Sequence, residues 1–238
     1  GWRADVALLG EVAGVDGGTY DGFLDALRQR RAAFVAAGAR ATDHGHLSAD
    51  TTPLPQSVAR ELYARVLAGA YANEAEVAAF AANLLYRMAE MACDDGLVMQ
   101  IHPGVLRDHH PGIARRHGAD KGHDIPVTTE YTRALRPLLE RVGTHPRFRL
   151  ILFTVDETTF SRELAPIAGA YPSVRLGAPW WFLDSPEAMG RFWGAATETA
   201  GFANLSGFVD DTRAFASIPA RHDLFRRSAA GYLARLVT

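Results

Sequence analysis

Five strand candidates alternate with longer amphipathic segments along this 238-residue chain, and this alternation constrains the fold more than any other feature. The first is a short segment that ends in polar residues, at 39–46, and the others are apolar runs at residues 96–104, 149–154, 174–181 and 207–211. Helical patterns separate them, at residues 20–37, 55–68, 74–93, 130–142, 161–170, 186–200 and 221–237. Strands separated by helices of this length form parallel βα units. We therefore expect an α/β fold with residues 1–238 in one domain.

Each strand candidate ends in side chains that can do chemistry. In chain order these are Asp43 and His44, His102, Thr154 and Asp156, Trp180 and Trp181, and Asp211 and Arg213. A barrel of βα units builds its active site from the carboxyl ends of several strands. We therefore predict that these strand ends share one site at the mouth of a barrel.

Asp211 and Arg213 are two positions apart, so they share one face of the chain if the strand continues, while Asp210 points to the other face. An inward carboxylate can ligate a divalent metal or move a proton. An inward guanidinium can bind a substrate oxygen or carboxylate. A structural ion pair, or a cap on the following turn, explains the two residues equally well.

Histidines follow the first two strand candidates. His102 precedes Pro103 and Gly104, which turn the chain, and it suits either proton transfer or a structural hydrogen bond. His44 and His46 form an H-x-H pair, which is a common metal-binding spacing. The intervening glycine, and the lack of a strand-like run before the pair, favour other roles for these two histidines.

Trp180 and Trp181 close the fourth strand candidate. Neighbouring residues of a strand face opposite sides, so we expect at most one of them to line the site and the other to pack under the helices. Core packing of both is the alternative.

Composition excludes several classes of protein. The net charge is −2 with both signs interspersed, so no basic face for nucleic acid is expected. The apolar runs fall far short of the roughly 20 residues that span a bilayer, and the start of the chain lacks a signal-peptide pattern. The single cysteine, Cys93, has no internal disulfide partner and suits a helix core. We expect a cytoplasmic protein with neither nucleic-acid nor membrane partners.

Six ordered segments resemble uronate isomerases (glucuronate isomerases) of the amidohydrolase superfamily. They are ATDHG, MQIHPGVLR, ILFTVDETTFSRELAPIAG, GAPWWFLDSPEAMGRF, GFVDDTRAF and SIPARHDLFRR. The resemblance implies a distorted (β/α)8 TIM barrel, one divalent metal that is often zinc, and a sugar acid as substrate. It implies the conversion of D-glucuronate to D-fructuronate and of D-galacturonate to D-tagaturonate.

The resemblance also implies roles for individual residues. Asp211 matches a carboxylate that binds the metal and takes part in proton movement, and Arg213 matches an arginine that contacts substrate oxygens. His102 belongs to the family's Q-x-H-x-G-x-x-R motif and Trp180 to its W-W-F motif, and both are expected to line the substrate pocket. The remaining predicted substrate-binding residues are Asp43, His44 and Arg107.

The chain departs from the family pattern near its start, where no H-x-H precedes Asp43. Trp2 to Asp5 resemble the family's W-R-P-D segment, but their spacing to the next segment fits a helix, so we expect Arg3 on a helix surface. We therefore expect an incomplete barrel of about five βα units, without the family's N-terminal strands and closing C-terminal segment. Its open sheet edges favour self-association into a homo-oligomer.

Three functions follow from this pattern. The first is uronate isomerisation, for which this chain alone is expected to bind its metal weakly or not at all, because only Asp211 remains as a ligand. The second is a metal-dependent hydrolase of the same superfamily. The third is an inactive truncated homologue with only a binding or assembly role.

Overall fold

A computed structural model describes residues 1–211 and 215–237. The chain divides into two compact units. The first contains Gly1–Thr42, Asp50–Met99 and Arg136–Phe148, and the second contains Asp43–Ala49, Gln100–Leu135 and Arg149–Thr238.

A parallel sheet of four strands carries the fold. Its strands are β1 (Ala41–His44), β2 (Val98–Ile101), β5 (Leu150–Leu152) and β6 (Val174–Leu176), in the order β1-β2-β5-β6. Strands β5 and β6 are parallel, with Leu150 opposite Val174 and Leu152 opposite Leu176. Both ends of each of these two strands are buried, as the continuous apolar runs predict. The expected α/β class is therefore confirmed, and four of the five predicted strands are present.

The fifth predicted strand, at residues 207–211, is absent, and that prediction was wrong. The chain touches the sheet at Leu205, which bridges Leu176, and at Ser206, whose amide donates to the Leu176 carbonyl at 2.8 Å. Gly207 (φ 80°) and Asp211 (φ 45°) then adopt left-handed conformations that a strand cannot contain. Asp211 and its neighbours therefore do not alternate between the two faces of a strand, contrary to the prediction.

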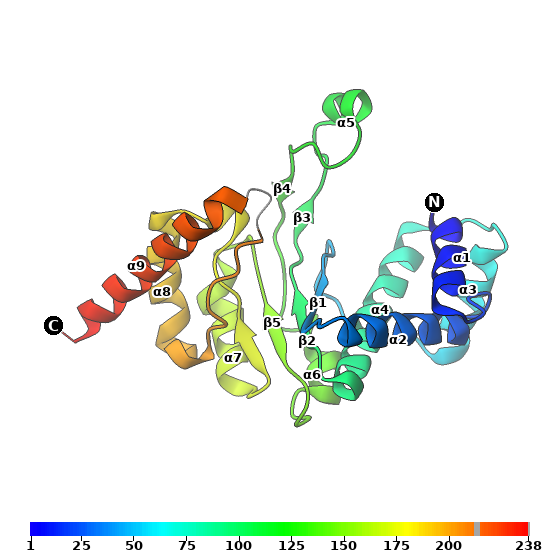
Figure 1. Ribbon diagram of the computed structural model, residues 1–238, viewed down its shortest axis with the longest axis horizontal. Coiled ribbons are helices and arrows are strands. Elements are labelled where there is room, and N and C mark those ends of the chain that lie inside the picture. The colour runs from blue at the N-terminus through cyan, green and yellow to red at the C-terminus, as the bar shows by residue number, and fades with distance from the viewer. Residues whose placement is uncertain (212–214, 238) are drawn as a thin grey trace. The chain divides into compact units, whose positions relative to one another are not determined.

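A two-stranded antiparallel ribbon was not predicted. Strands β3 (Val105–Leu106) and β4 (Ile125–Pro126) pair with Val105 opposite Pro126, and helix α5 (Pro111–His117) lies at the far end of the ribbon (Figure 1). Strands of two residues are too short to show a periodic pattern, which explains why they could not be predicted.

The first unit is largely helical. Its helices are α1 (Trp2–Ala13), α2 (Tyr20–Ala36), α3 (Gln56–Leu67), α4 (Glu74–Asp95) and α6 (Arg136–Val142). Tyr20, Phe23, Tyr63 and Met91 belong to its core. Because these helices have one apolar face, the sequence predicted α2, α3 and α4 to within two residues at each end.

Two further predictions in this unit are confirmed. Arg3 is exposed on α1, and Cys93 is buried in α4. Burial, and to a smaller extent the charge of the nearby Asp94, raise the pKa of the Cys93 thiol. The thiol therefore stays protonated and unreactive. The buried Arg31 of α2 holds Asp95 at the end of α4 through two nitrogens, at 2.6 Å and 3.0 Å.

Helices of the second unit pack beside β5 and β6. A π-helix, η1 (Phe160–Leu164), runs into α7 (Ala165–Ala170), and α8 (Pro186–Ala200) packs against both of them (Figure 1). Helix α9 (Ile218–Leu236) packs on α8, where the buried Trp193 donates its indole N–H to Ser228 at 2.9 Å. Three 3₁₀ turns, η2 (Trp181–Leu183), η3 (Phe202–Asn204) and η4 (Phe215–Ser217), connect these helices. No helix in the described part of the chain is long and apolar enough to cross a bilayer.

Candidate active site

A cleft of about 370 Å³ lies in the second unit. His102, Trp180, Asp211 and Arg107, all predicted site residues, lie on its walls. A smaller cavity of about 190 Å³ shares His102, Trp180 and Asp211 with the cleft and adds Asp43. The structure therefore brings five predicted site residues together from β1, β2, β6 and the segments that follow them.

His102 follows β2, and its ring is held by Asp43 at the end of β1. Its Nδ1 donates to Asp43 Oδ1 at 2.7 Å, which leaves Nε2 as the ring nitrogen that can exchange a proton. A methyl group on Gly45 would lie 2.7 Å from that Nε2, so only glycine leaves enough room for the imidazole at this position. The glycine between His44 and His46 thus makes room for His102.

His44 and His46 have different surroundings. The His44 carbonyl accepts the backbone N–H of His102 at 3.0 Å, which places His44 in the β1 to β2 pairing. Burial, and then the neighbouring His102, lower the pKa of His46. His46 is therefore neutral at neutral pH. No group of three potential metal ligands occurs among residues 1–211 and 215–237.

Both tryptophans line the cleft, so the prediction that at most one would do so was wrong. Strand β6 ends at Leu176, and Trp181 has a left-handed backbone (φ 57°) that begins the turn η2, so the alternation of a strand does not reach the pair. Trp180 is 8% exposed and contacts His102 edge-on, with ring centroids 5.6 Å apart. Its indole Nε1 lies 3.4 Å from Asp211 Oδ2.

Arg107 reaches the cleft from the end of β3. Its guanidinium lies over the Trp181 ring at 5.4 Å and donates to Asp120 at 3.2 Å. Asp124 is 4.0 Å away. The side chain is 46% exposed, so solvent screens these ion pairs and the guanidinium can exchange partners. The other predicted arginine, Arg213, lies outside the described residues.

Arg221 also lines the cleft, and the sequence analysis missed it. It lies on α9 and binds Asp184 and Asp210, which are far from it in the sequence. Asp210 Oδ2 is buried and has no hydrogen-bond partner in the structure as described. An arginine on an amphipathic helix is expected to face solvent, so the local sequence around Arg221 does not indicate a role in the site.

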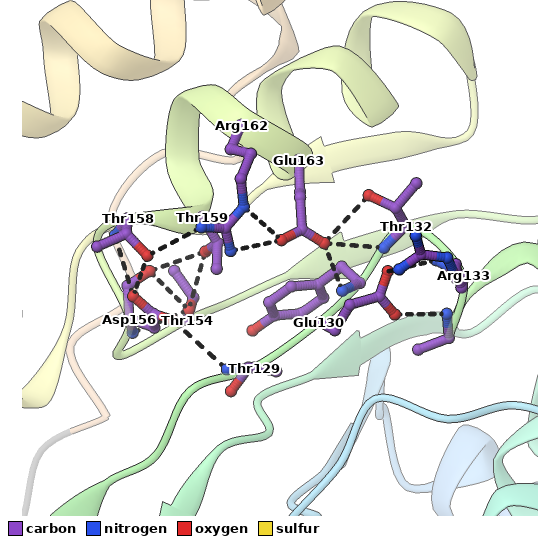
Figure 2. Close-up of polar contacts among 12 residues, drawn as sticks. Thr129, Glu130, Thr132, Arg133, Thr154, Asp156, Thr158, Thr159, Arg162 and Glu163 are labelled. Carbon is purple, nitrogen blue, oxygen red and sulfur yellow. Dashed lines mark hydrogen bonds and ion pairs between the residues drawn. The ribbon is translucent and has the colours of Figure 1, made fainter.

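The end of β5 is a different kind of polar cluster (Figure 2). Asp156 Oδ1 accepts the backbone N–H and the hydroxyl of Thr158, at 3.1 Å and 2.6 Å, and the Thr159 hydroxyl lies 3.2 Å from that of Thr154. The structure therefore uses Thr154 and Asp156 to hold the turn after β5, and it does not place them on the walls of the cleft described above.

The buried Glu163 extends this cluster. One of its oxygens accepts the backbone N–H groups of Tyr131 and Thr132, at 2.6 Å and 3.0 Å, and the Thr132 hydroxyl at 3.1 Å. Its other oxygen accepts from Arg162 at 2.6 Å. Burial alone would raise the pKa of Glu163, but the hydrogen bonds from Tyr131, Arg162 and Thr132 outweigh burial and lower it. The helix predicted from residue 130 begins only at Arg136 in the structure, as α6.

Comparisons with known proteins agree on one family. The family model for glucuronate isomerase matches residues 1–238. A uronate isomerase of Rhizorhabdus wittichii is 59% identical over 238 residues, which are 100% of this chain and 51% of that protein. The chain thus spans about half the length of the curated relatives it matches.

Solved structures give the same answer. The crystal structure of glucuronate isomerase from Caulobacter crescentus has a TM-score of 0.94 and 52% identity, over 98% of this chain and 48% of that chain. A uronate isomerase from Thermotoga maritima also has a TM-score of 0.94, with 30% identity over 100% of this chain and 52% of that chain. Together with the match of the family model along its whole length, these likenesses show that the chain belongs to the glucuronate isomerase family.

Proposed function

We propose that the protein is a uronate isomerase that interconverts D-glucuronate with D-fructuronate and D-galacturonate with D-tagaturonate. Family membership and the names of the relatives support this reaction class. The observation that carries the proposal is the cleft itself, because it combines an imidazole held by Asp43 with the carboxylate of Asp211 beside an aromatic wall.

We further propose that the whole protein is an amidohydrolase-type (β/α)8 barrel, to which this chain contributes β1, β2, β5 and β6. The parallel order of these strands supports that architecture. Homo-oligomerisation stays a prediction.

A divalent metal is expected from the family resemblance, with Asp211 as one ligand. The described residues do not gather three candidate ligands, so they do not form a metal site of ordinary coordination by themselves. The mechanism below therefore uses no metal, and the ligand role of Asp211 stays a prediction.

The reaction moves a hydrogen between C2 and C1 of the open-chain sugar acid. A base removes the C2 proton, the C–H electron pair forms the C1=C2 bond of a cis-enediol, and the C1 carbonyl oxygen takes up a proton. Return of a proton to C1, with loss of the proton on O2, gives the ketose. The site therefore needs a base near C2 and a proton donor near the oxygens.

We assign these tasks to two side chains of the cleft. Asp211 takes the proton from C2, exchanges it with solvent while the enediol is bound, and delivers a proton to C1. His102, whose Nδ1 is held by Asp43, uses Nε2 to give and receive the oxygen-bound proton. The face of Trp180 packs on the carbon skeleton of the substrate.

Arg107 is the residue that we assign to the carboxylate of the sugar acid. Its guanidinium is half exposed and bound to Asp120 in screened contacts, which a substrate carboxylate can replace with a bidentate pair. The contact with the Trp181 ring keeps the guanidinium beside the aromatic wall of the cleft. Arg213, in the same proposal, binds the oxygens that gain charge.

The experiment is an assay of ketose formation from D-glucuronate and D-galacturonate by the protein at its full natural length, with D-glucose as the substrate without a carboxylate. Conversion of a uronate but not of glucose supports the proposal, and conversion of neither uronate contradicts it.

Arg213→Ala should lower kcat strongly. Arg107→Ala should raise KM about tenfold, because it loses a charge-assisted pair, while the control Arg133→Ala should not. Arg133 is a suitable control because it is 90% exposed and pairs only loosely with Glu130 at 3.8 Å.

A further inference from the structure

We propose that Arg221 is a positioning residue of the active site, a clamp that fixes the segment carrying Trp180 and Trp181 against the segment carrying Asp211. This inference rests on the proposed function. It concerns how the cleft keeps its shape and adds no group that touches the substrate.

The contacts of Arg221 join two segments that are separate in the sequence. Its Nη1 donates to the backbone carbonyl of Asp210 at 2.8 Å and to Asp210 Oδ1 at 2.6 Å, while Nη2 donates to the carboxylate of Asp184. A guanidinium is planar and presents its donors at fixed angles. One side chain therefore sets the distance between Asp184 and Asp210.

Each clamped aspartate is tied to a residue of the proposed chemistry. Asp184 closes the turn η2, in which its backbone N–H lies 3.4 Å from the carbonyl of Trp181. Asp210 directly precedes Asp211. The two segments meet again where the Trp180 indole N–H lies 3.4 Å from Asp211 Oδ2. Moving either aspartate therefore moves Asp211 relative to Trp180.

Charge makes the clamp necessary. Asp184, Asp210 and Asp211 bring three carboxylates to the lining of the cleft, and the side chains of Asp184 and Asp210 are only 15% and 10% exposed. Two poorly solvated carboxylates repel each other unless a cation lies between them. The Arg221 side chain, 28% exposed and 5.8 Å from the centre of the Phe208 ring, supplies that cation.

The test compares Arg221→Lys with Arg227→Ala in the full-length protein. Lysine keeps the charge but cannot reach both carboxylates with one ammonium. We expect Arg221→Lys to lower kcat about 10²-fold with a much smaller change in KM, because misplacing a catalytic group by about 1 Å has that effect. Arg227 is the matched control, since it lies on the same helix and forms an exposed pair with Asp223. Wild-type kcat in Arg221→Lys would overturn the proposal.

A double variant separates positioning from general destabilisation. Trp180→Phe removes the indole N–H that donates to Asp211. Because this hydrogen bond and the contacts of Arg221 both hold Asp211 relative to Trp180, the two substitutions disturb the same arrangement. The loss of kcat in Arg221→Lys with Trp180→Phe should therefore fall well short of the product of the two single losses. Losses that multiply would overturn the proposal. If Arg221→Lys does not fold, Asp184→Asn releases the other end of the clamp and should show the same fall in kcat.

Tryptophan fluorescence without substrate distinguishes failure of this inference from failure of the proposed function. If the wild-type protein converts neither uronate, the proposed function fails, but the clamp is still tested. Arg221→Lys should shift the emission to longer wavelength and make it easier to quench with acrylamide, because Trp180 loses its shielding, while Arg227→Ala should leave both unchanged. An unchanged spectrum in Arg221→Lys would overturn the clamp.

Discussion

The polar clusters at the ends of β5 and β2 differ in how completely their hydrogen-bonding groups are used. At the end of β5, the oxygens of Asp156 and Glu163 accept from backbone and side-chain donors close by, and Glu163 is buried (Figure 2). At the end of β2, His102 uses Nδ1 for Asp43 and turns the rest of its ring toward cavities. The first cluster holds the fold together, and the second has groups left for a ligand.

A polar strand end is therefore not by itself a functional site. A buried network in which every donor and acceptor is paired stabilises the folded state, because a buried polar group without a hydrogen-bond partner costs free energy. A cluster with free groups on a cleft can bind and react. Variants of the β5 cluster should therefore change stability, and variants of the cleft should change activity.

The largest expected effect is that of Asp211→Asn. Loss of the carboxylate removes the proposed base and should lower kcat about 10³-fold, or about 4 kcal/mol in the activation free energy. Asparagine tolerates the left-handed backbone at this position (φ 45°), so the free energy of unfolding should stay within about 1 kcal/mol of wild type. Steady-state kinetics and urea unfolding measure the two quantities. If the free energy of unfolding fell by as much as the activation free energy rose, Asp211 would stabilise the fold as the cluster at the end of β5 does.

Glu163→Ala should show the opposite behaviour. It leaves the buried N–H group of Tyr131 and the part-buried N–H group of Thr132 without their acceptor, so the free energy of unfolding should fall by about 3 kcal/mol. Urea unfolding followed by circular dichroism measures this change, and kcat per folded molecule should stay close to wild type. Glu140→Ala, which removes an exposed ion pair with Arg136, is the control and should have little effect.

Gly45→Ala should lower activity by displacing His102. The added methyl group would lie 2.7 Å from His102 Nε2 and must displace the imidazole. We expect kcat/KM to fall about tenfold, or about 1.4 kcal/mol, with a smaller loss of stability. Gly190→Ala on α8 is the control, because a methyl group there meets no atom within 4 Å. Equal kcat/KM of the two variants would show that activity does not depend on the position of the His102 ring.

The smallest expected effect is a dependence of stability on pH. The pKa of Glu163 is lowered in the folded protein, so the unfolded chain binds the proton more readily. Its contribution to stability is therefore full above the unfolded pKa of 4.5 and is lost as pH falls below that value. Urea unfolding across this range should show a steeper decline for wild type than for Glu163→Gln. Parallel curves would mean that the network does not favour the charged carboxylate.

Much of the fold could be predicted because it follows from periodicity. The amphipathic faces of α2 and α4, and the apolar runs of β5 and β6, follow from burial on one or both faces. The segment at Gly207 to Asp211 could not be predicted, because two left-handed residues interrupt a run whose composition suits a strand.

The site was predictable where it depends on strand ends. His102 and Trp180 follow β2 and β6, and parallel strands bring their carboxyl ends to one edge. The same rule could not separate Asp156, which serves the turn after β5, from residues of the cleft. It also missed Arg221, because an ion pair between distant segments leaves no local pattern.

Deuterium exchange shows whether Asp211 moves the C2 proton of a uronate in this cleft. D-Glucuronate is incubated in D₂O with the full-length protein, with Asp211→Asn and with Glu163→Gln, and NMR follows deuterium entering the carbon-bound positions at C2 of the aldose and C1 of the ketose. The account predicts exchange by wild type and Glu163→Gln at similar rates per folded molecule, and exchange slowed about 10³-fold in Asp211→Asn. Exchange at the wild-type rate in Asp211→Asn would contradict it.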